Sequence, residues 1–171
     1  MSSSTVPLFK PLMLAFVTST LMTGCASLSP FSTMTKLNLT LIAGNQLNPD
    51  LNGRPSPVVV RLLELKHPVA FENADFFSLY ERARETLSPD LIASEELELR
   101  PGETVRLRLD IAGGGRYVGI LAAYRDLPQA KWRYTLPIIA GRVTEASLTL
   151  DQDGIATRLG KPAGWVIDES R

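Results

Sequence analysis

The sequence is poor in the residues from which most catalytic and metal sites are built. It has one cysteine, Cys25, and one histidine, His67, among its 171 residues. A single thiol cannot form an internal disulfide, and zinc sites and catalytic triads need histidines or cysteines in combination. His67 precedes Pro68 after a predicted strand, so we expect a surface turn residue. These absences predict a domain that is not an enzyme and holds no metal.

The chain also lacks an excess of charge and a long apolar run. Its 18 basic residues equal its 18 acidic residues, whereas a nucleic-acid-binding domain would show a basic excess. Glu95 and Glu96 border a predicted strand, and we expect a solvated face there rather than a glycoside hydrolase site. The apolar run at residues 11–21 is 11 residues long, and a helix needs roughly 20 to span a bilayer. No nucleic-acid partner and no retained membrane span are expected.

What the N-terminus does contain is the three-part pattern of an exported protein. A polar segment precedes the apolar run, and the small residues Thr23 and Gly24 follow it. Leu21, Gly24 and Cys25 match the Leu-x-x-Gly/Ala-Cys pattern of the bacterial lipoprotein signal. The alternative is an ordinary signal peptide with an incidental cysteine near its cleavage site. We favour lipidation, in which residues 1–24 are removed and Cys25 receives a diacylglyceryl group and an N-acyl chain, with no other cofactor.

Lipidation would anchor the mature chain firmly, because one acyl chain gives only reversible binding and further chains add to it. Ala26 follows the cysteine. In many Gram-negative bacteria an aspartate there retains a lipoprotein in the inner membrane, so alanine favours the periplasmic face of the outer membrane.

Residues 25–35 are small and polar, and we expect a flexible tether that reaches roughly 30 Å when extended. The 147 residues left after cleavage are typical of one domain.

Residues 36–160 are predicted to form a mainly β domain. The segment 58–65 is apolar almost throughout, which predicts a central strand covered on both faces. Pro137 favours an edge position for its strand, and Asp153-Gly154 predicts a hairpin between the last two strands. About eight short strands with turns at regular spacing indicate a β-sandwich. The predicted strands are 36–43, 58–65, 96–100, 104–111, 117–124, 132–139, 146–150 and 155–159.

One helical insertion is expected at residues 74–93. Its apolar stripe has helical spacing, Asn73 or Asp75 can cap its start, and Ser88-Pro89-Asp90 can end it and cap a further single turn through Ala93. The stripe consists of Phe76, Leu79, Tyr80, Ala83 and Leu87.

Three other patterns are explained by turns and packing. Asp151-Gln152-Asp153-Gly154 lacks the third aspartate and the glutamate of a calcium loop, and a hairpin turn is expected instead. The glycines at 113–115 lack the third glycine of a phosphate-binding frame, so we expect a turn. Trp132 and Trp165 are aromatic residues of the kind that stack on sugars, although packing is the favoured role for Trp132.

The longest predicted loop is residues 44–57, which follows the first predicted strand. It contains three prolines, two glycines and three asparagines, which exclude regular structure. Long loops in compact domains are often functional, and proline limits the entropy that is lost on ordering. We expect a preshaped contact surface, with a purely structural Ω-loop as the alternative.

This loop and several other segments resemble the TssJ (VasD/SciN-like) family of type VI secretion outer-membrane lipoproteins. The resemblance covers most of the mature chain and includes the lipidation pattern, but it assigns no role to the tail at 161–171. It implies a transthyretin-like β-sandwich with one inserted helical element, on the periplasmic face of the outer membrane. The similar segments are Leu47-Asn48-Pro49-Asp50, residues 53–62, 74–80, 99–103 and 122–127, and Trp132-Arg133.

The resemblance also implies a partner and a contact surface. The partner is the periplasmic C-terminal domain of TssM, which belongs to a membrane complex with TssL, and the contact is the loop between the first two strands. We expect Leu47 and Leu51 to be apolar anchors, Arg54 to be a polar anchor, and Asn48-Pro49-Asp50 to set the loop's shape, with no small-molecule substrate. The alternative is a periplasm-facing lipoprotein that binds a small ligand or glycan through Trp132, Trp165 and nearby carboxylates. The expected contact residues are Asn45, Gln46, Leu47, Asn48, Pro49, Asp50, Leu51, Asn52, Gly53, Arg54 and Pro55.

Overall fold

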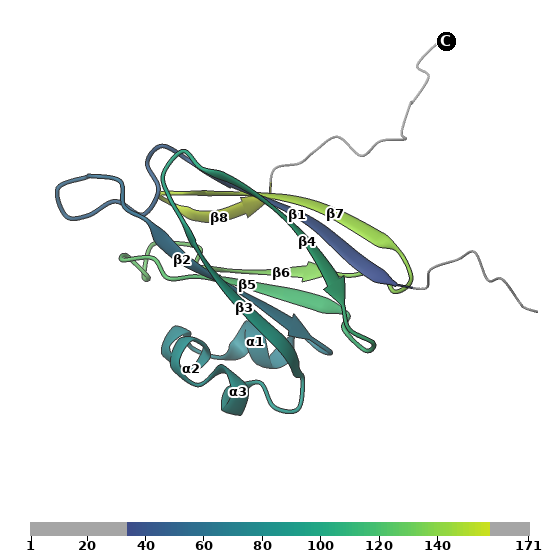
Figure 1. Cartoon of the computed structure of the whole chain (residues 1–171). Helices are drawn as coiled ribbons and strands as arrows, with labels where there is room; N and C mark the ends of the chain where they lie inside the picture. Colours follow the sequence, from purple (N-terminus) through teal and green to yellow (C-terminus); the bar gives the residue numbers. More distant parts are fainter. Residues whose placement is uncertain (1–33, 158–171) are drawn as a thin grey trace, which may run out of the picture. The chain divides into compact units, whose positions relative to one another are not determined.

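Two four-stranded sheets pack face to face, and three short helices cover the outer face of one of them (Figure 1). The computed structural model describes residues 34–157. The predicted signal peptide, Cys25, the tether up to residue 33, Trp165 and the 161–171 tail lie outside the described residues. Within them, the predicted eight-stranded β-sandwich is confirmed.

The first sheet has the strand order β4-β1-β7-β8. Strand β1 runs antiparallel to β4 and parallel to β7. Its alternating leucines, Leu37, Leu39 and Leu41, are fully buried between the sheets, as the period of two predicts. The hairpin predicted at Asp153-Gly154 joins β7 to β8. The strands are β1 Thr35–Ala43, β4 Thr104–Ile111, β7 Val143–Asp151 and β8 Gly154–Thr157.

The second sheet has the order β3-β2-β5-β6, which confirms the central position of β2 and the edge position of the Pro137 strand. Strand β3 begins at Leu91, five residues before the predicted start of its strand. The predicted single turn through Ala93 is therefore wrong, because these residues pair with β2. The strands are β2 Val58–Leu65, β3 Leu91–Leu99, β5 Tyr117–Ala122 and β6 Arg133–Pro137.

The helical insertion also differs from the prediction of one helix within 74–93. The structure has α1 Val69–Asn73, α2 Phe76–Glu81 and α3 Ala83–Thr86. The predicted helix is interrupted at Arg82, whose φ of −130° and ψ of 38° are not helical. Asp75 caps α2 as predicted, since its carboxylate accepts a hydrogen bond from the Ser78 N–H at 3.0 Å.

Strand β2 explains why the helices cover this sheet. Its residues at alternate positions, Val60 and Leu62, face the other sheet, while Leu63 and Leu65 face the helices. On the helix side, Phe71 of α1 packs over Gly119 of β5, where a Cβ atom would lie 2.9 Å from the Phe71 ring. Glycine therefore allows α1 to approach the sheet closely, and the prediction that 58–65 is covered on both faces is confirmed.

Candidate functional site

The loop between β1 and β2 projects from the end of the sandwich at which β1 ends (Figure 1). Its first residues are fastened to that end. The Gly44 N–H donates to the Leu150 carbonyl at 2.7 Å, and the Gly44 carbonyl accepts from the Gly102 N–H at 3.3 Å. Leu47 is fully buried in the core between the sheets, and its carbonyl accepts from the Ser56 N–H at 3.0 Å. The loop therefore has a rigid base.

Asn48 links the base to two other segments. Its Nδ2 donates to the Pro57 carbonyl at 2.8 Å, and its Oδ1 accepts from the Arg125 N–H at 2.8 Å. The residue is only 3% exposed, and its φ of 46° is left-handed, a conformation in which asparagine is enriched. Arg125 lies in the β5–β6 loop, and the sequence does not predict its contact with Asn48. An asparagine beside a proline gives no signal of which distant backbone it will bind.

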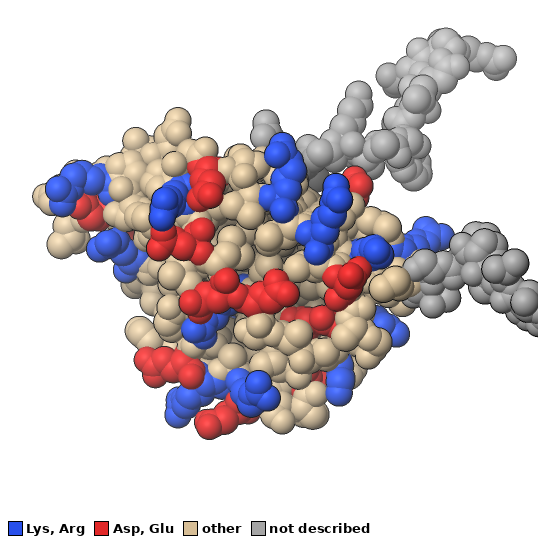
Figure 2. Space-filling model, in the orientation of Figure 1, with Lys and Arg blue, Asp and Glu red and all other residues tan. Residues whose placement is uncertain are grey.

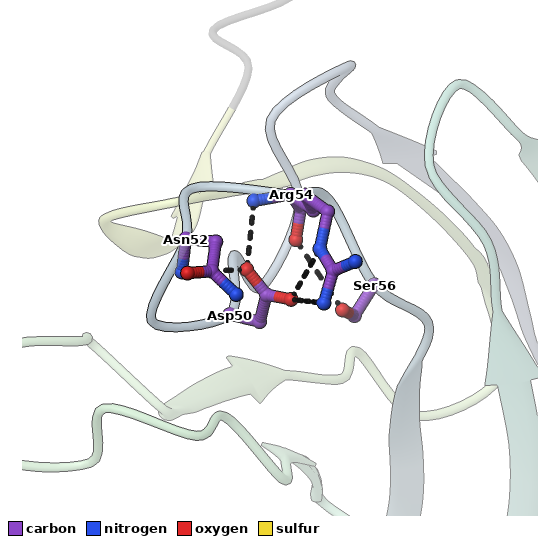
Figure 3. A network of polar contacts seen from close by, with 4 residues as sticks. All are labelled: Asp50, Asn52, Arg54 and Ser56. Atoms are coloured by element: carbon purple, nitrogen blue, oxygen red, sulfur yellow. Dashed lines mark hydrogen bonds and ion pairs between the residues drawn. The ribbon is translucent and has the colours of Figure 1, made fainter.

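Asp50 organises the tip of the loop (Figure 3). Its Oδ1 accepts hydrogen bonds from the N–H groups of Asn52 at 2.8 Å and Arg54 at 2.9 Å. Its Oδ2 accepts from Arg54 Nε at 2.7 Å and lies 2.7 Å from Nη2, so two guanidinium nitrogens contact the same carboxylate oxygen. The Asp50 N–H donates to the Arg54 carbonyl at 2.9 Å. The tip is thus a closed ring of five residues, 50–54.

These contacts lower the pKa of the Asp50 carboxyl below its ordinary value. The largest cause is the hydrogen bond from the Arg54 N–H, followed by the one from the Arg54 side chain. A carboxyl with a lowered pKa is ionised throughout the neutral range. The charge that holds the ring closed is therefore present at any pH near 7.

The ring presents one large apolar side chain to solvent. Leu51 is fully exposed, and the residues around it at the tip are polar or small. The expectation that both leucines of the loop are partner anchors is wrong for Leu47, because its side chain fills the core. The structure brings Leu51 and the Asp50–Arg54 pair together at the tip. The other exposed residues of the loop are Asn45, Gln46, Asn52, Gly53, Arg54, Pro55 and Pro57, and Pro49 is half-buried.

The other residues weighed in the sequence have structural positions. Trp132 is half-buried, meets the Phe76 ring edge-on at 5.3 Å and has the Arg133 guanidinium 4.5 Å above its ring, which confirms a packing role. His67 is an exposed turn residue whose Nδ1 lies 2.8 Å from the Asp90 carboxylate. Glu95 and Glu96 face opposite sides of β3, and Glu96 pairs with Arg61 at 2.6 Å.

A cleft of about 260 Å³ opens between the edge strands β3 and β4. Glu64 lines it, with its Oε1 accepting from the Ala112 N–H at 2.8 Å. Burial raises the pKa of the Glu64 carboxyl above its ordinary value. Within residues 34–157, no three acidic, histidine or cysteine side chains are grouped to hold a metal ion. No helix in this part of the chain is both long and apolar enough to cross a membrane.

The fold and the loop together define a class: a two-sheet β-sandwich with a helical cover and one preshaped loop presented at its end. The chain belongs to the family described as type VI secretion lipoprotein, VasD, EvfM, TssJ, VC_A0113, whose model matches residues 35–153.

Solved structures agree with this assignment. The type VI lipoprotein TssJ1 from Pseudomonas aeruginosa is 38% identical, with a TM-score of 0.70 over 72% of this chain and 94% of that one. Serratia marcescens Lip, described as a membrane-bound component of the type VI secretion system, is 28% identical, with a TM-score of 0.68 over 72% and 96%. A chain of a type VI membrane complex is 26% identical, with a TM-score of 0.64 over 72% and 98%. A search of curated proteins found no significant match.

Proposed function

We propose that this protein is a lipid-anchored tether of the type VI secretion membrane complex. Cys25 carries diacylglyceryl and N-acyl chains that hold the protein in the outer membrane, with the domain in the periplasm. The β1–β2 loop binds the periplasmic C-terminal domain of TssM, which forms the membrane complex with TssL. The protein acts by connecting a membrane to a partner, and no reaction is catalysed.

The closed tip of the β1–β2 loop is the observation that carries this proposal. Leu51 is fully exposed on a ring fixed by the Asp50–Arg54 pair, so little loop entropy is lost when a partner covers it. An exposed aliphatic side chain on a rigid support gains free energy when a pocket on another protein removes it from water. Membership of the lipoprotein family and the likeness to a chain of a type VI membrane complex support this choice of partner.

Lipidation is tested by Cys25→Ser in the full-length chain. We expect the variant to leave the outer-membrane fraction, to lose labelling by a palmitate analogue and to abolish secretion. A variant that still fractionates with the outer membrane contradicts the anchoring residue.

The loop is tested separately by replacing residues 50–54 with a Gly-Ser segment of equal length. We expect pull-down of the TssM periplasmic domain to be lost, while circular dichroism and the unfolding transition stay close to wild type because the loop base remains. As a control at the same end of the sandwich, exposed Gln152 in the β7–β8 turn can be replaced by serine, and wild-type pull-down is expected. Equal pull-down by the 50–54 variant contradicts the proposed interface.

A further inference from the structure

A second exposed apolar cluster lies at the end of the sandwich opposite to the β1–β2 loop. It consists of Met34, Ile139 and Val143, whose side chains are 54%, 59% and 55% exposed. We name these three residues the Met34 cluster. No role for them follows from the proposed contact with TssM, because nine residues of β1 separate this end from the loop.

The backbone brings the three residues together. The starts of β1 and β7 pair in parallel, with Lys36 opposite Val143. The Lys36 N–H donates to the Arg142 carbonyl at 3.0 Å, and the Gly141 N–H donates to the Thr35 hydroxyl at 2.9 Å. The 140–142 turn is therefore fixed against the beginning of β1, and it carries Ile139 and Val143 on its two sides.

Three basic residues lie on the backbone segments next to this cluster, together with two acidic ones. Arg142 lies in the turn itself, and the carbonyl of exposed Arg116 accepts from the Ile138 N–H at 2.8 Å. Lys36 is the third basic residue. Its ammonium group lies 3.4 Å from the carboxylate of Asp110 on the neighbouring strand, and both side chains are largely exposed. Glu145 follows two positions after Val143 on β7. Figure 2 shows several basic side chains at the end where β1 begins. Exposed apolar side chains next to two exposed arginines match an anionic phospholipid surface.

The position of Met34 in the chain indicates that the cluster faces a lipid surface. Cys25 precedes Met34 by nine residues, a span of at most roughly 30 Å even when fully extended. If Cys25 is lipidated, as proposed above, the chain enters the domain at this end from the bilayer. The Met34 cluster is then held close to the lipid surface at a high effective concentration, so a weak intrinsic affinity is enough to orient the domain.

We propose that the Met34 cluster and the neighbouring arginines, Arg116 and Arg142, dock the tethered domain onto the anionic phospholipid surface. The nine residues of β1, at about 3.3 Å each, place the β1–β2 loop about 30 Å farther from the bilayer. Docking thus points Leu51 away from the membrane, toward the partner. This inference rests on the proposed lipidation of Cys25, and it adds an orientation that the lipid alone does not provide.

The test uses the full lipidated protein in vesicles of phosphatidylethanolamine and phosphatidylglycerol. Cys25 is the only cysteine, and lipidation consumes its thiol, so Ile139→Cys introduces one thiol for an environment-sensitive NBD dye. Leu51→Cys is the matched control, because it replaces an exposed aliphatic residue at the other end. We expect NBD at 139 to shift to the blue and to be quenched by spin-labelled lipids, and NBD at 51 to do neither.

The two arginines provide a second test of docking. Each basic residue near an anionic surface strengthens binding by roughly fivefold, so Arg116→Glu with Arg142→Glu is expected to reduce the docked-to-undocked ratio by at least roughly 25-fold, and high salt is expected to act in the same direction. On protein that floats with the vesicles, identical emission from positions 139 and 51 overturns the docking surface alone. Protein that labels at two thiols and does not float contradicts lipidation, and the docking proposal falls with it.

Discussion

Asp50 and Arg54 form an ion pair across the tip of the β1–β2 loop. One carboxylate receives the backbone N–H of Arg54 at 2.9 Å and its guanidinium at 2.7 Å, so the backbone and the side chain of one residue bind the same partner. The pair closes the ring beneath Leu51, whose own side chain touches solvent only. The shape of the tip is therefore set by a contact within the loop, before any partner arrives.

Arg54→Ala is expected to raise the pKa of Asp50 toward its ordinary value of 3.8. The rise is partial, because the largest cause of the lowered pKa, the residue-54 N–H, remains. Since the native pKa is lowered, the contribution of Asp50 to stability is present above pH 3.8 and is lost as the pH falls through the native value. Carboxyl ¹³C NMR titration measures both pKa values. An unchanged value in the variant would mean that the guanidinium contributes nothing to closing the ring.

Asn48→Ala is expected to lower the free energy of unfolding by about 1–3 kcal/mol, because the Arg125 N–H and the Pro57 carbonyl lose their partner. The left-handed φ adds roughly 1–2 kcal/mol for alanine. Asn48→Gly loses the same hydrogen bonds without that strain, so urea denaturation should rank wild type above glycine and glycine above alanine. Equal stability of all three proteins would contradict the role of Asn48 in fixing the loop base.

Glu64→Gln is expected to stabilise the domain near pH 7. Burial raises the native pKa of Glu64 above its ordinary value of 4.5, so the wild-type protein loses stability as the pH rises from 4.5 through the native pKa. Glutamine keeps an oxygen to accept the Ala112 N–H, but it carries no charge. Urea midpoints measured from pH 4 to pH 8 should therefore fall less in the variant. Parallel curves would show that the burial of Glu64 has no energetic effect.

The strands were predictable because each has a strong local pattern. The bounds of β2 and β4 match the prediction. Pro57 precedes the apolar run of β2, and the turn at Pro101-Gly102 precedes the alternating run of β4. The helical insertion was less predictable. Its apolar stripe has helical spacing on both sides of Arg82, and periodicity does not report the local break there. The stripe is nevertheless buried, because Leu79 and Leu87 still pack on Leu63 and Leu65.

The site was predictable as a segment but not residue by residue. Composition singles out the 44–57 loop, yet Leu47 and Leu51 look alike in the sequence. Only the packing of the loop base against the sandwich separates them, with Leu47 in the core and Leu51 in solvent. The contact between Asn48 and Arg125 joins residues 77 positions apart, and no local pattern encodes it.

The central claim is that Leu51 at the preshaped tip binds the TssM periplasmic domain. Its most direct test is titration calorimetry of that domain with the wild-type protein, with Leu51→Asp and with Phe77→Asp. The second variant is a control that makes the same kind of apolar-to-acidic change at an exposed residue of α2. Leu51→Asp should leave the unfolding transition unchanged and weaken binding by at least about 30-fold, as the loss of ~2 kcal/mol from burying a leucine side chain does, while Phe77→Asp binds like wild type. Wild-type affinity in the Leu51→Asp protein would contradict the account.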